Sequence, residues 1–518
     1  MAESRVQKSI QNAKVNLIFY FITLFLSFFS RKIFLDCLGD DFVGLTGTLG
    51  NLLNFLNLAE LGIGAAIGTV LYKPIFDCDR EKINEIISVF GYFYRKVGFV
   101  IAGGGIALSA FLPLIFAKTE FDLALIYFAF YAFLTSALIG YFANYKQVLL
   151  GADQRNYVVI AYFQTSNLIK TFIQIALAYY TRNYYYWVAV ELCFGMIYSI
   201  ILNWKIRKVY PWLRSEIRNG RLLRKRYPLI MTYSRQLFVH KIGSLVQFQI
   251  KPLLIYSFVS LQVVAFYGNY SLIIDKVILL IKNMLGSTGA GVGNLVAEGD
   301  KVKIRKIYWE LTALNYFIAG LFVFAVYHLI QPFIVLWVGP EYVLSRWVLI
   351  ILLGNMFIMQ TRGTNDQFLY AYSLFHDIWA PIVETVVSIS ISLAGGYYWG
   401  LEGVLLGSVV SMFFIVVLWK PYFLYRRGFQ DKLREYWWGI VRYILLILVA
   451  WIITSGIIRY VSIDPYRSYW NWIQFALVIV GILGGVLFTF FCLFSAGFRY
   501  FLKRVKERLK LKFKIKAW

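Results

Sequence analysis

The sequence predicts an all-α protein that crosses a membrane many times. Hydrophobic residues make up 60% of the 518 residues and charged residues only 15%, whereas about a quarter of the residues of a soluble domain are charged. Apolar stretches follow one another from Val15 to Phe498, and short polar loops separate them. Roughly 20 consecutive apolar residues cross a bilayer as a helix. No loop reaches the roughly 50 residues that an independent domain needs.

Counting stretches of this length gives about fourteen expected spans. Their approximate limits, in chain order, are Val15–Leu38, Gly44–Leu71, Val97–Phe116, Phe121–Phe142, Tyr157–Tyr180, Tyr184–Trp204, Leu229–Val259, Val264–Leu285, Ile307–Val338, Trp347–Tyr370, Ile378–Tyr398, Leu401–Tyr425, Trp438–Tyr460 and Trp470–Ala496. The tightest turns are expected around residues 180–184 and 398–401. The basic N-terminal stretch leads into the first span without a small-residue cleavage signal, so we expect a retained signal-anchor.

The loops differ in charge according to the side of the membrane on which they would lie. Every second loop is basic: Lys73–Lys96, Lys205–Arg226, Lys301–Lys306, Lys420–Arg434 and the tail Arg499–Lys516. The alternate loops carry few cations. Cytoplasmic loops of membrane proteins collect Lys and Arg, so both termini are expected in the cytoplasm. The tail alternates basic and apolar residues, which favours an amphipathic segment on the inner leaflet over a partner-binding site.

The net charge of +25 has the same explanation, and we expect no nucleic-acid partner. The four cysteines and three histidines are scattered along the chain. They show neither metal-ligand spacing nor a disulfide framework. The sequence therefore predicts no metal and no cofactor.

Charged residues inside the expected spans are the candidate functional residues. A charge at the bilayer centre costs about 2.5–3.5 kcal/mol on insertion scales, so such residues face protein or water. The candidate substrate-binding cations are Arg31, Lys170, Lys251, Lys276, Arg362 and His240. The candidate gating or ion-coupling carboxylates are Glu60, Glu384 and Asp275, and Asp366 is a further buried acid.

Two simpler explanations compete with a binding role. Arg31, Lys251 and Arg362 lie near span ends, where a long side chain can snorkel to the headgroups. Each charge can also belong to a structural ion pair between helices. Because the cations outnumber the carboxylates, we favour a water-filled, positively lined cavity that suits a phosphate-bearing substrate.

Two further features concern energy and catalysis. The sequence contains no Walker P-loop, and no outer loop exceeds roughly a dozen residues, too short for a domain of its own. A membrane glycosyltransferase, polymerase or ligase is expected to place acid–base groups on larger loops. Transport is therefore favoured over catalysis, and we expect no enzyme activity.

A faint internal repeat relates the two halves of the chain. Leu61–Pro74 ends the second expected span, and Gly286–Lys301 follows the eighth. Both are runs of small residues that lead into a charged loop. The offset of six spans predicts that the two halves of the chain are parallel copies of each other. Small residues also serve ordinary helix packing, which is the simpler explanation.

The stretch from Arg31 to Ile67, RKIFLDCLGDDFVGLTGTLGNLLNFLNLAELGIGAAI, resembles polysaccharide transporters. These are the Wzx-type lipid-linked oligosaccharide flippases of the multidrug/oligosaccharidyl-lipid/polysaccharide exporter superfamily. Ser257–Ile273 and Gly289–Asp300 also fit this pattern. One departure is Lys251-Pro252, where many relatives carry an Asp-Asn pair.

The resemblance implies two six-helix bundles in a V-shaped alternating-access arrangement, plus a C-terminal helix pair that in lipid II flippases helps form a lipid-tail groove. The implied divisions are 1–207 for helices 1–6, 208–227 for a basic linker, 228–427 for helices 7–12, 428–498 for helices 13–14 and 499–518 for the tail. The implied cargo is an undecaprenyl-pyrophosphate-linked oligosaccharide of O-antigen, capsule or exopolysaccharide synthesis. It would cross the bacterial inner membrane, with membrane lipids, a polysaccharide polymerase and other assembly proteins as partners.

We therefore expect a flippase in which the cations hold the diphosphate. The acids would form gating ion pairs or couple to H⁺ or Na⁺. The alternatives are a cation-coupled small-molecule exporter of the same superfamily, a membrane glycan polymerase or ligase, and, weakest, a structural scaffold.

Overall fold

The structure is a computed structural model. It describes residues 5–516 except 57–62, 118, 154, 229, 233, 235–248, 286–291, 293–294, 297, 373 and 375–376. Throughout these residues the regular structure is helical, without strands, which confirms the predicted all-α membrane fold. Nine helices of the described part are long and apolar enough to cross a membrane.

The chain divides into two compact units, Met1–Ala265 and Phe266–Trp518. The linker expected at 208–227 lies within the first unit. Helical residues 249–258 also belong to it. There Tyr256 stacks on Phe116 with 5.5 Å between ring centroids, which fixes this segment on the first unit.

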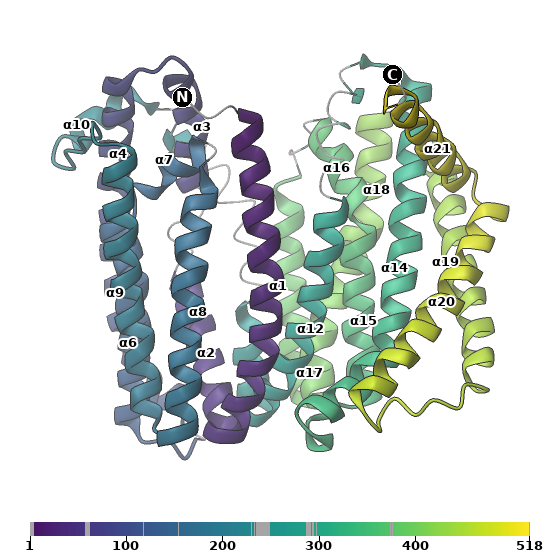
Figure 1. Cartoon of the computed structure of the whole chain (residues 1–518), viewed down its shortest axis with the longest axis horizontal. Coiled ribbons are helices and arrows are strands. Elements are labelled where there is room, and N and C mark those ends of the chain that lie inside the picture. The colour runs from purple at the N-terminus through teal and green to yellow at the C-terminus, as the bar shows by residue number, and fades with distance from the viewer. Residues whose placement is uncertain are drawn as a thin grey trace. The chain divides into compact units, whose positions relative to one another are not determined.

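Unit 1 consists of helices that pack side by side (Figure 1). They are α1 (Arg5–Leu38), α2 (Asp40–Leu56), α3 (Ile63–Phe76), α4 (Arg80–Ser109), α5 (Leu112–Ile115), α6 (Leu123–Ala143), α7 (Gln147–Ala152), α8 (Asn156–Thr181), α9 (Tyr184–Val209), α10 (Gly220–Leu223) and η2 (Arg224–Arg226). Helix α9 packs against α6 and α8, and α8 packs against α1.

Unit 2 is also a bundle, into which α12 (Leu261–Leu285) leads from unit 1. Its remaining elements are α14 (Lys301–Trp337), η4 (Pro340–Tyr342), α15 (Arg346–Thr361), α16 (Gly363–Ala371), α17 (Trp379–Met412), η5 (Phe413–Trp419), α18 (Lys420–Phe423), η6 (Leu424–Phe429), α19 (Leu433–Ile458), α20 (Tyr469–Phe494) and α21 (Ala496–Lys516). Helix α14 packs against α15, α19, α20 and α21 and forms the centre of this unit.

Two helices begin earlier than the hydropathy predicts. The stretches Lys73–Lys96 and Lys301–Lys306 were expected as loops, but α4 starts at Arg80 and α14 at Lys301. The backbone N–H of Lys82 donates to the Asp79 carboxylate, and that of Lys303 donates to Asp300, so each Asp caps a helix. The Lys82 ammonium also bonds to the Asp79 side chain and lowers the pKa of that carboxyl.

Helix α17 contains the tight turn that was expected near residues 398–401. Gly400 has φ +56° and ψ −126°, a conformation that side chains rarely adopt. The two arms touch closely behind this turn, because a Cβ atom on Gly403 would lie 1.9 Å from the carbonyl oxygen of Gly395. The Ser392 hydroxyl donates to the Val404 carbonyl across the same contact, 2.7 Å away. Small residues thus let two membrane-crossing arms pack backbone to backbone.

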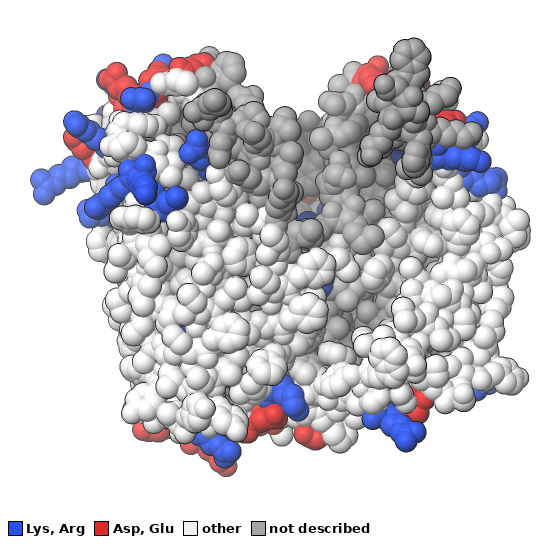
Figure 2. All heavy atoms as spheres, in the orientation of Figure 1, with Lys and Arg blue, Asp and Glu red and all other residues white. Residues whose placement is uncertain are grey.

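On the face shown in Figure 2, charged side chains gather at the two ends of each unit, and the described surface between them shows few charges. Such an uncharged surface suits the hydrocarbon core of a lipid bilayer. The charged residues that line pockets within the bundle of unit 1 define the candidate site.

Candidate substrate-binding pockets

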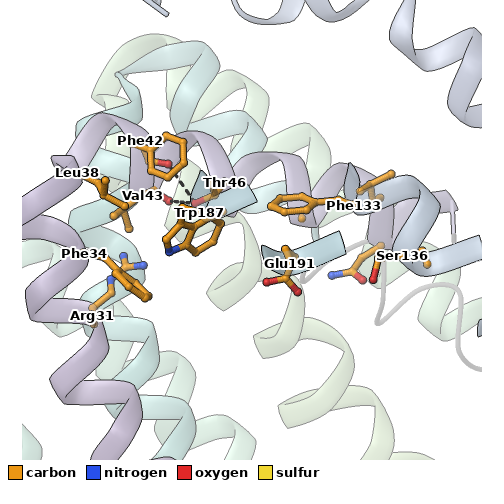
Figure 3. A pocket seen from close by; sticks show the side chains of 15 residues that line it. Arg31, Phe34, Leu38, Phe42, Val43, Thr46, Phe133, Ser136, Trp187 and Glu191 are labelled. Carbon is orange, nitrogen blue, oxygen red and sulfur yellow. Dashed lines mark hydrogen bonds between the residues drawn. The ribbon is translucent and has the colours of Figure 1, made fainter. Parts of the chain in front are cut away.

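Unit 1 encloses a pocket of about 570 Å³ between α1, α2, α6 and α9. Its lining combines an aromatic wall with a few polar groups (Figure 3). Trp187 of α9 packs edge-on against Phe34 and Phe42, each with 5.6 Å between ring centroids. Arg31 and Glu191 supply the two charges. An apolar cavity with a few placed polar groups is typical of a ligand site.

A second pocket of about 460 Å³ adjoins the first between α6, α8 and α9. The two share Ser136, Ala137 and Glu191. The second pocket is more polar, and its polar lining residues are Ser136, Asn144, Gln147, Ser166, Asn167, Lys170, Glu191 and Tyr198. Hydroxyl, amide and charged groups therefore continue from one pocket into the next.

Lys170 and Glu191 form an ion pair in the second pocket. The Lys170 ammonium lies 2.7 Å from Glu191 Oε1, and the two side chains are 17% and 26% exposed. Gln174 donates to the other carboxylate oxygen at 3.3 Å. Such partners stabilise a charge inside a membrane span, and Lys170 has its carboxylate partner on the neighbouring helix α9.

Arg31 lies in the first pocket, on α1. Its guanidinium donates to the carbonyl oxygen of Ala265 at 3.0 Å. The side chain is half-buried within the pocket wall. A guanidinium presents five N–H donors in a fixed fork, a geometry that suits anionic oxygens.

Asn144 organises the end of the second pocket. Its side-chain oxygen accepts hydrogen bonds from the Ser199 hydroxyl at 2.7 Å and from the Asn203 amide at 3.0 Å. Asn144 is 4% exposed. This buried network fixes α9 against the C-terminal end of α6.

In unit 2, three charged side chains meet around Asp366. Arg362 Nε lies 2.7 Å from one oxygen of Asp366, and the Lys420 ammonium lies 3.0 Å from the other. Glu384 interacts electrostatically with the same cluster. Two cations thus face two carboxylates, and the cluster is close to neutral.

The other predicted residues are more dispersed. Lys251 is buried, Lys276 is half-buried, and Asp275 is exposed beside it. His240 and Glu60 lie outside the described residues. Lys251 does not line either of the two adjoining pockets described above.

The prediction from the sequence left out three groups. Glu191 and Lys420 complete the ion pairs, and Asn144 anchors the polar network. Glu191 is the single carboxylate of α9, and it follows the turn at Arg182 that Lys170 precedes. Lys170 lies 12 residues before Arg182 and Glu191 lies 9 after it, so their depths differ by about one helical turn, and this proximity is the signal that could have paired them.

Comparison with known proteins supports the fold. No family model matches the sequence. The uncharacterized membrane protein EpsK of Bacillus subtilis (strain 168) is 21% identical over 487 residues, which cover 88% of this chain and 91% of EpsK.

Among solved structures, the lipid II flippase MurJ in an inward closed conformation is similar with a TM-score of 0.63 and 12% identity, over 91% of this chain and 98% of MurJ. An inward-facing multidrug resistance MATE family transporter of the MOP superfamily has a TM-score of 0.57 and 15% sequence identity, over 80% of this chain and 98% of that transporter. The Vibrio cholerae MATE transporter VcmN has a TM-score of 0.51 and 14% sequence identity, over 82% of this chain and 98% of VcmN. The chain therefore has the fold that these flippase and transporter structures share.

Proposed function

We propose that this protein is a flippase that moves undecaprenyl-pyrophosphate-linked oligosaccharides across the bacterial inner membrane by alternating access. The adjoining pockets of unit 1 carry this proposal. They place about 570 and 460 Å³ of partly polar space inside a helix bundle whose surface suits lipid. A scaffold or a lipid-packed bundle has no use for such space.

The lining of the pockets suits the headgroup of the proposed cargo. Arg31 offers a charged fork of donors, which matches phosphate oxygens. The amides and hydroxyls around Asn144 and Tyr198 offer donors and acceptors for sugar hydroxyls, and Trp187 offers an apolar face. The prenyl chain would stay in the bilayer while the headgroup crosses inside the protein.

Lys170 has a second role in this proposal. In the structure its charge is held by Glu191. An arriving diphosphate would compete with Glu191 for Lys170 and open the ion pair between α8 and α9. The pair therefore acts as a gate that senses the substrate, and the Asp366 cluster is the corresponding element of unit 2. The role of Lys251 and Lys276 as further phosphate ligands stays part of the proposal.

A second candidate is the cation-coupled export of small molecules, and one observation favours it. The cations of both clusters are matched by carboxylates, so the excess of positive charge is smaller than the composition suggests. The same carboxylates could bind H⁺ or Na⁺. No enzymatic role is proposed.

A reconstitution experiment separates the two candidates. The protein is placed in proteoliposomes that contain an undecaprenyl-pyrophosphate-linked oligosaccharide, and exposure of the glycan to a membrane-impermeant glycosidase is measured. We expect protein-dependent exposure. The exporter would be established instead if the protein released cationic dyes in response to an H⁺ or Na⁺ gradient and exposed no glycan.

A matched pair of variants tests the pocket. Arg31→Gln should slow translocation about 10-fold or more, because a charge-assisted hydrogen bond contributes about 1.5–3 kcal/mol. Lys32→Gln is the control, since Lys32 is the next residue on α1 and pairs with Asp36 at an exposed position outside the pocket. If Arg31→Gln and Lys32→Gln translocated the glycan at the same rate, Arg31 would be excluded from the site.

A further inference from the structure

A third pocket lies in unit 2, apart from the proposed transport site. It has a volume of about 830 Å³ and lies between the start of α14, the start of α19 and the α20–α21 junction. Five cations and a single carboxylate line it: Arg305, Lys306, Lys432, Arg434, Arg442 and Glu435. The lining is therefore strongly positive.

Most of this positive charge is available to a ligand. Arg305 is held by Asp431 and by Glu435, whose carboxylate lies 2.7 Å away. The other four cations take part in no ion pair of the described part of the chain. Lys306 instead sits over the ring of Tyr500, with 4.4 Å between the ammonium and the ring centroid.

Aromatic side chains place this pocket at the boundary between lipid and water. Trp438 is 66% exposed and Tyr500 47% exposed. Exposed Trp and Tyr side chains are enriched where the hydrocarbon core meets the headgroups. The exposed Phe494 adds an apolar rim. A molecule bound here therefore meets an apolar rim and a cationic interior.

The third wall of the pocket is formed by the amphipathic helix α21. This helix begins at Ala496, and Arg504 joins it to α14 through an ion pair with the buried Glu310, at 3.0 Å. Helix α21 is thereby fixed on unit 2, and the pocket forms where α21 leaves the end of α20.

We propose that this pocket binds the phosphate headgroup of an anionic membrane phospholipid such as phosphatidylglycerol. Basic pockets between membrane helices bind anionic lipid headgroups by the same combination of cations and an adjacent apolar surface. The bound lipid bridges α19 and the α20–α21 junction. It therefore stabilises the position of the C-terminal helix.

The test measures lipid binding by the purified full-length protein. Phosphatidylglycerol and phosphatidylcholine are titrated into the detergent-solubilised protein, and bound lipids are counted by native mass spectrometry. The variant Lys432→Gln/Arg434→Gln/Arg442→Gln should lose affinity for phosphatidylglycerol about 10- to 100-fold, from the loss of three surface cations. The single change Arg442→Gln, with an expected loss of about 5-fold, replaces it if the triple variant does not fold.

The control variant removes the same number of charges elsewhere in unit 2. Lys301→Gln/Arg426→Gln/Arg427→Gln alters exposed cations that do not line the pocket, and it should keep the affinity within about 2-fold, because salt screens exposed charges that do not contact the ligand. Equal losses in both variants would overturn the proposal. The proposal would also be overturned if inorganic phosphate at matched ionic strength completely displaced phosphatidylglycerol. It would be overturned as well if the protein bound a prenyl diphosphate more tightly than phosphatidylglycerol.

Discussion

The ion pair between Lys170 and Glu191 leads to a prediction that separates structural from functional charge. We consider three variants: Lys170→Met, Glu191→Gln and the double change. Each single change leaves the other charge without its partner inside the membrane. For a fully buried pair this costs about 3–5 kcal/mol.

The structure lowers the expected cost here. The two side chains are 17% and 26% exposed, and Gln174 keeps one hydrogen bond to Glu191. We therefore expect each single variant to lose about 2 kcal/mol of unfolding free energy. The double variant removes both charges together and should lose about 1 kcal/mol, because replacing a whole buried pair is often close to neutral. The cycle then gives a coupling energy of about 3 kcal/mol.

Two measurements on the same samples provide the answer. Thermal unfolding of the detergent-solubilised protein reports the stability, and the proteoliposome glycan assay reports transport. We expect the double variant to be nearly as stable as the unmodified protein but at least about 10-fold slower in translocation, since it lacks a charged phosphate donor.

Two results would refute this reasoning. If Lys170→Met were as stable as the unmodified protein, the pair would not hold α8 to α9. If the double variant were stable and fully active, Lys170 would have no part in handling the substrate.

Three further predictions concern the bundles and the orientation. Asn144→Leu should cost about 2 kcal/mol, seen as a lower unfolding temperature, because the Ser199 hydroxyl loses its buried acceptor; an unchanged unfolding temperature would contradict this. Gly403→Leu should lower the unfolding free energy by about 3 kcal/mol, because the new side chain forces the arms of α17 apart at Gly395. Gly354 has open space around it, so Gly354→Ala should leave the unfolding temperature nearly unchanged. A fluorescent protein fused to the C-terminus should be fluorescent and alkaline phosphatase fused there inactive, and the opposite pattern would place this end outside the cytoplasm.

The sequence predicted the membrane-crossing helices well where polar residues mark their ends. The spans expected at Tyr157–Tyr180 and Tyr184–Trp204 correspond to α8 and α9. Here Asn183 accepts hydrogen bonds from the first backbone N–H groups of α9, a signal that is readable in sequence. The helical start of α4 was missed because hydropathy measures apolar length, and this segment is amphipathic.

The candidate site was predicted only in part, because hydropathy gives the depth of a residue but not its neighbours. Arg31 lines a pocket of unit 1, and its role there stays a prediction, whereas the partner of Lys170 was not identified from the sequence. Lys420 was expected in a loop, yet it begins α18 and contacts Asp366. Such pairing depends on how helices distant in sequence pack, and no local pattern encodes it.

The turn at Gly400 has a consequence for the biosynthesis of the protein. The arms of α17 meet directly behind the turn, so the turn between them is short. Few backbone N–H and C=O groups outside the helical hydrogen bonds therefore have to cross the hydrocarbon when this segment enters the bilayer. The Ser392 hydroxyl already has its acceptor on the opposite arm. The two arms can therefore leave the translocation machinery as one preassembled unit, which places the next element of the chain on the side from which the first arm entered.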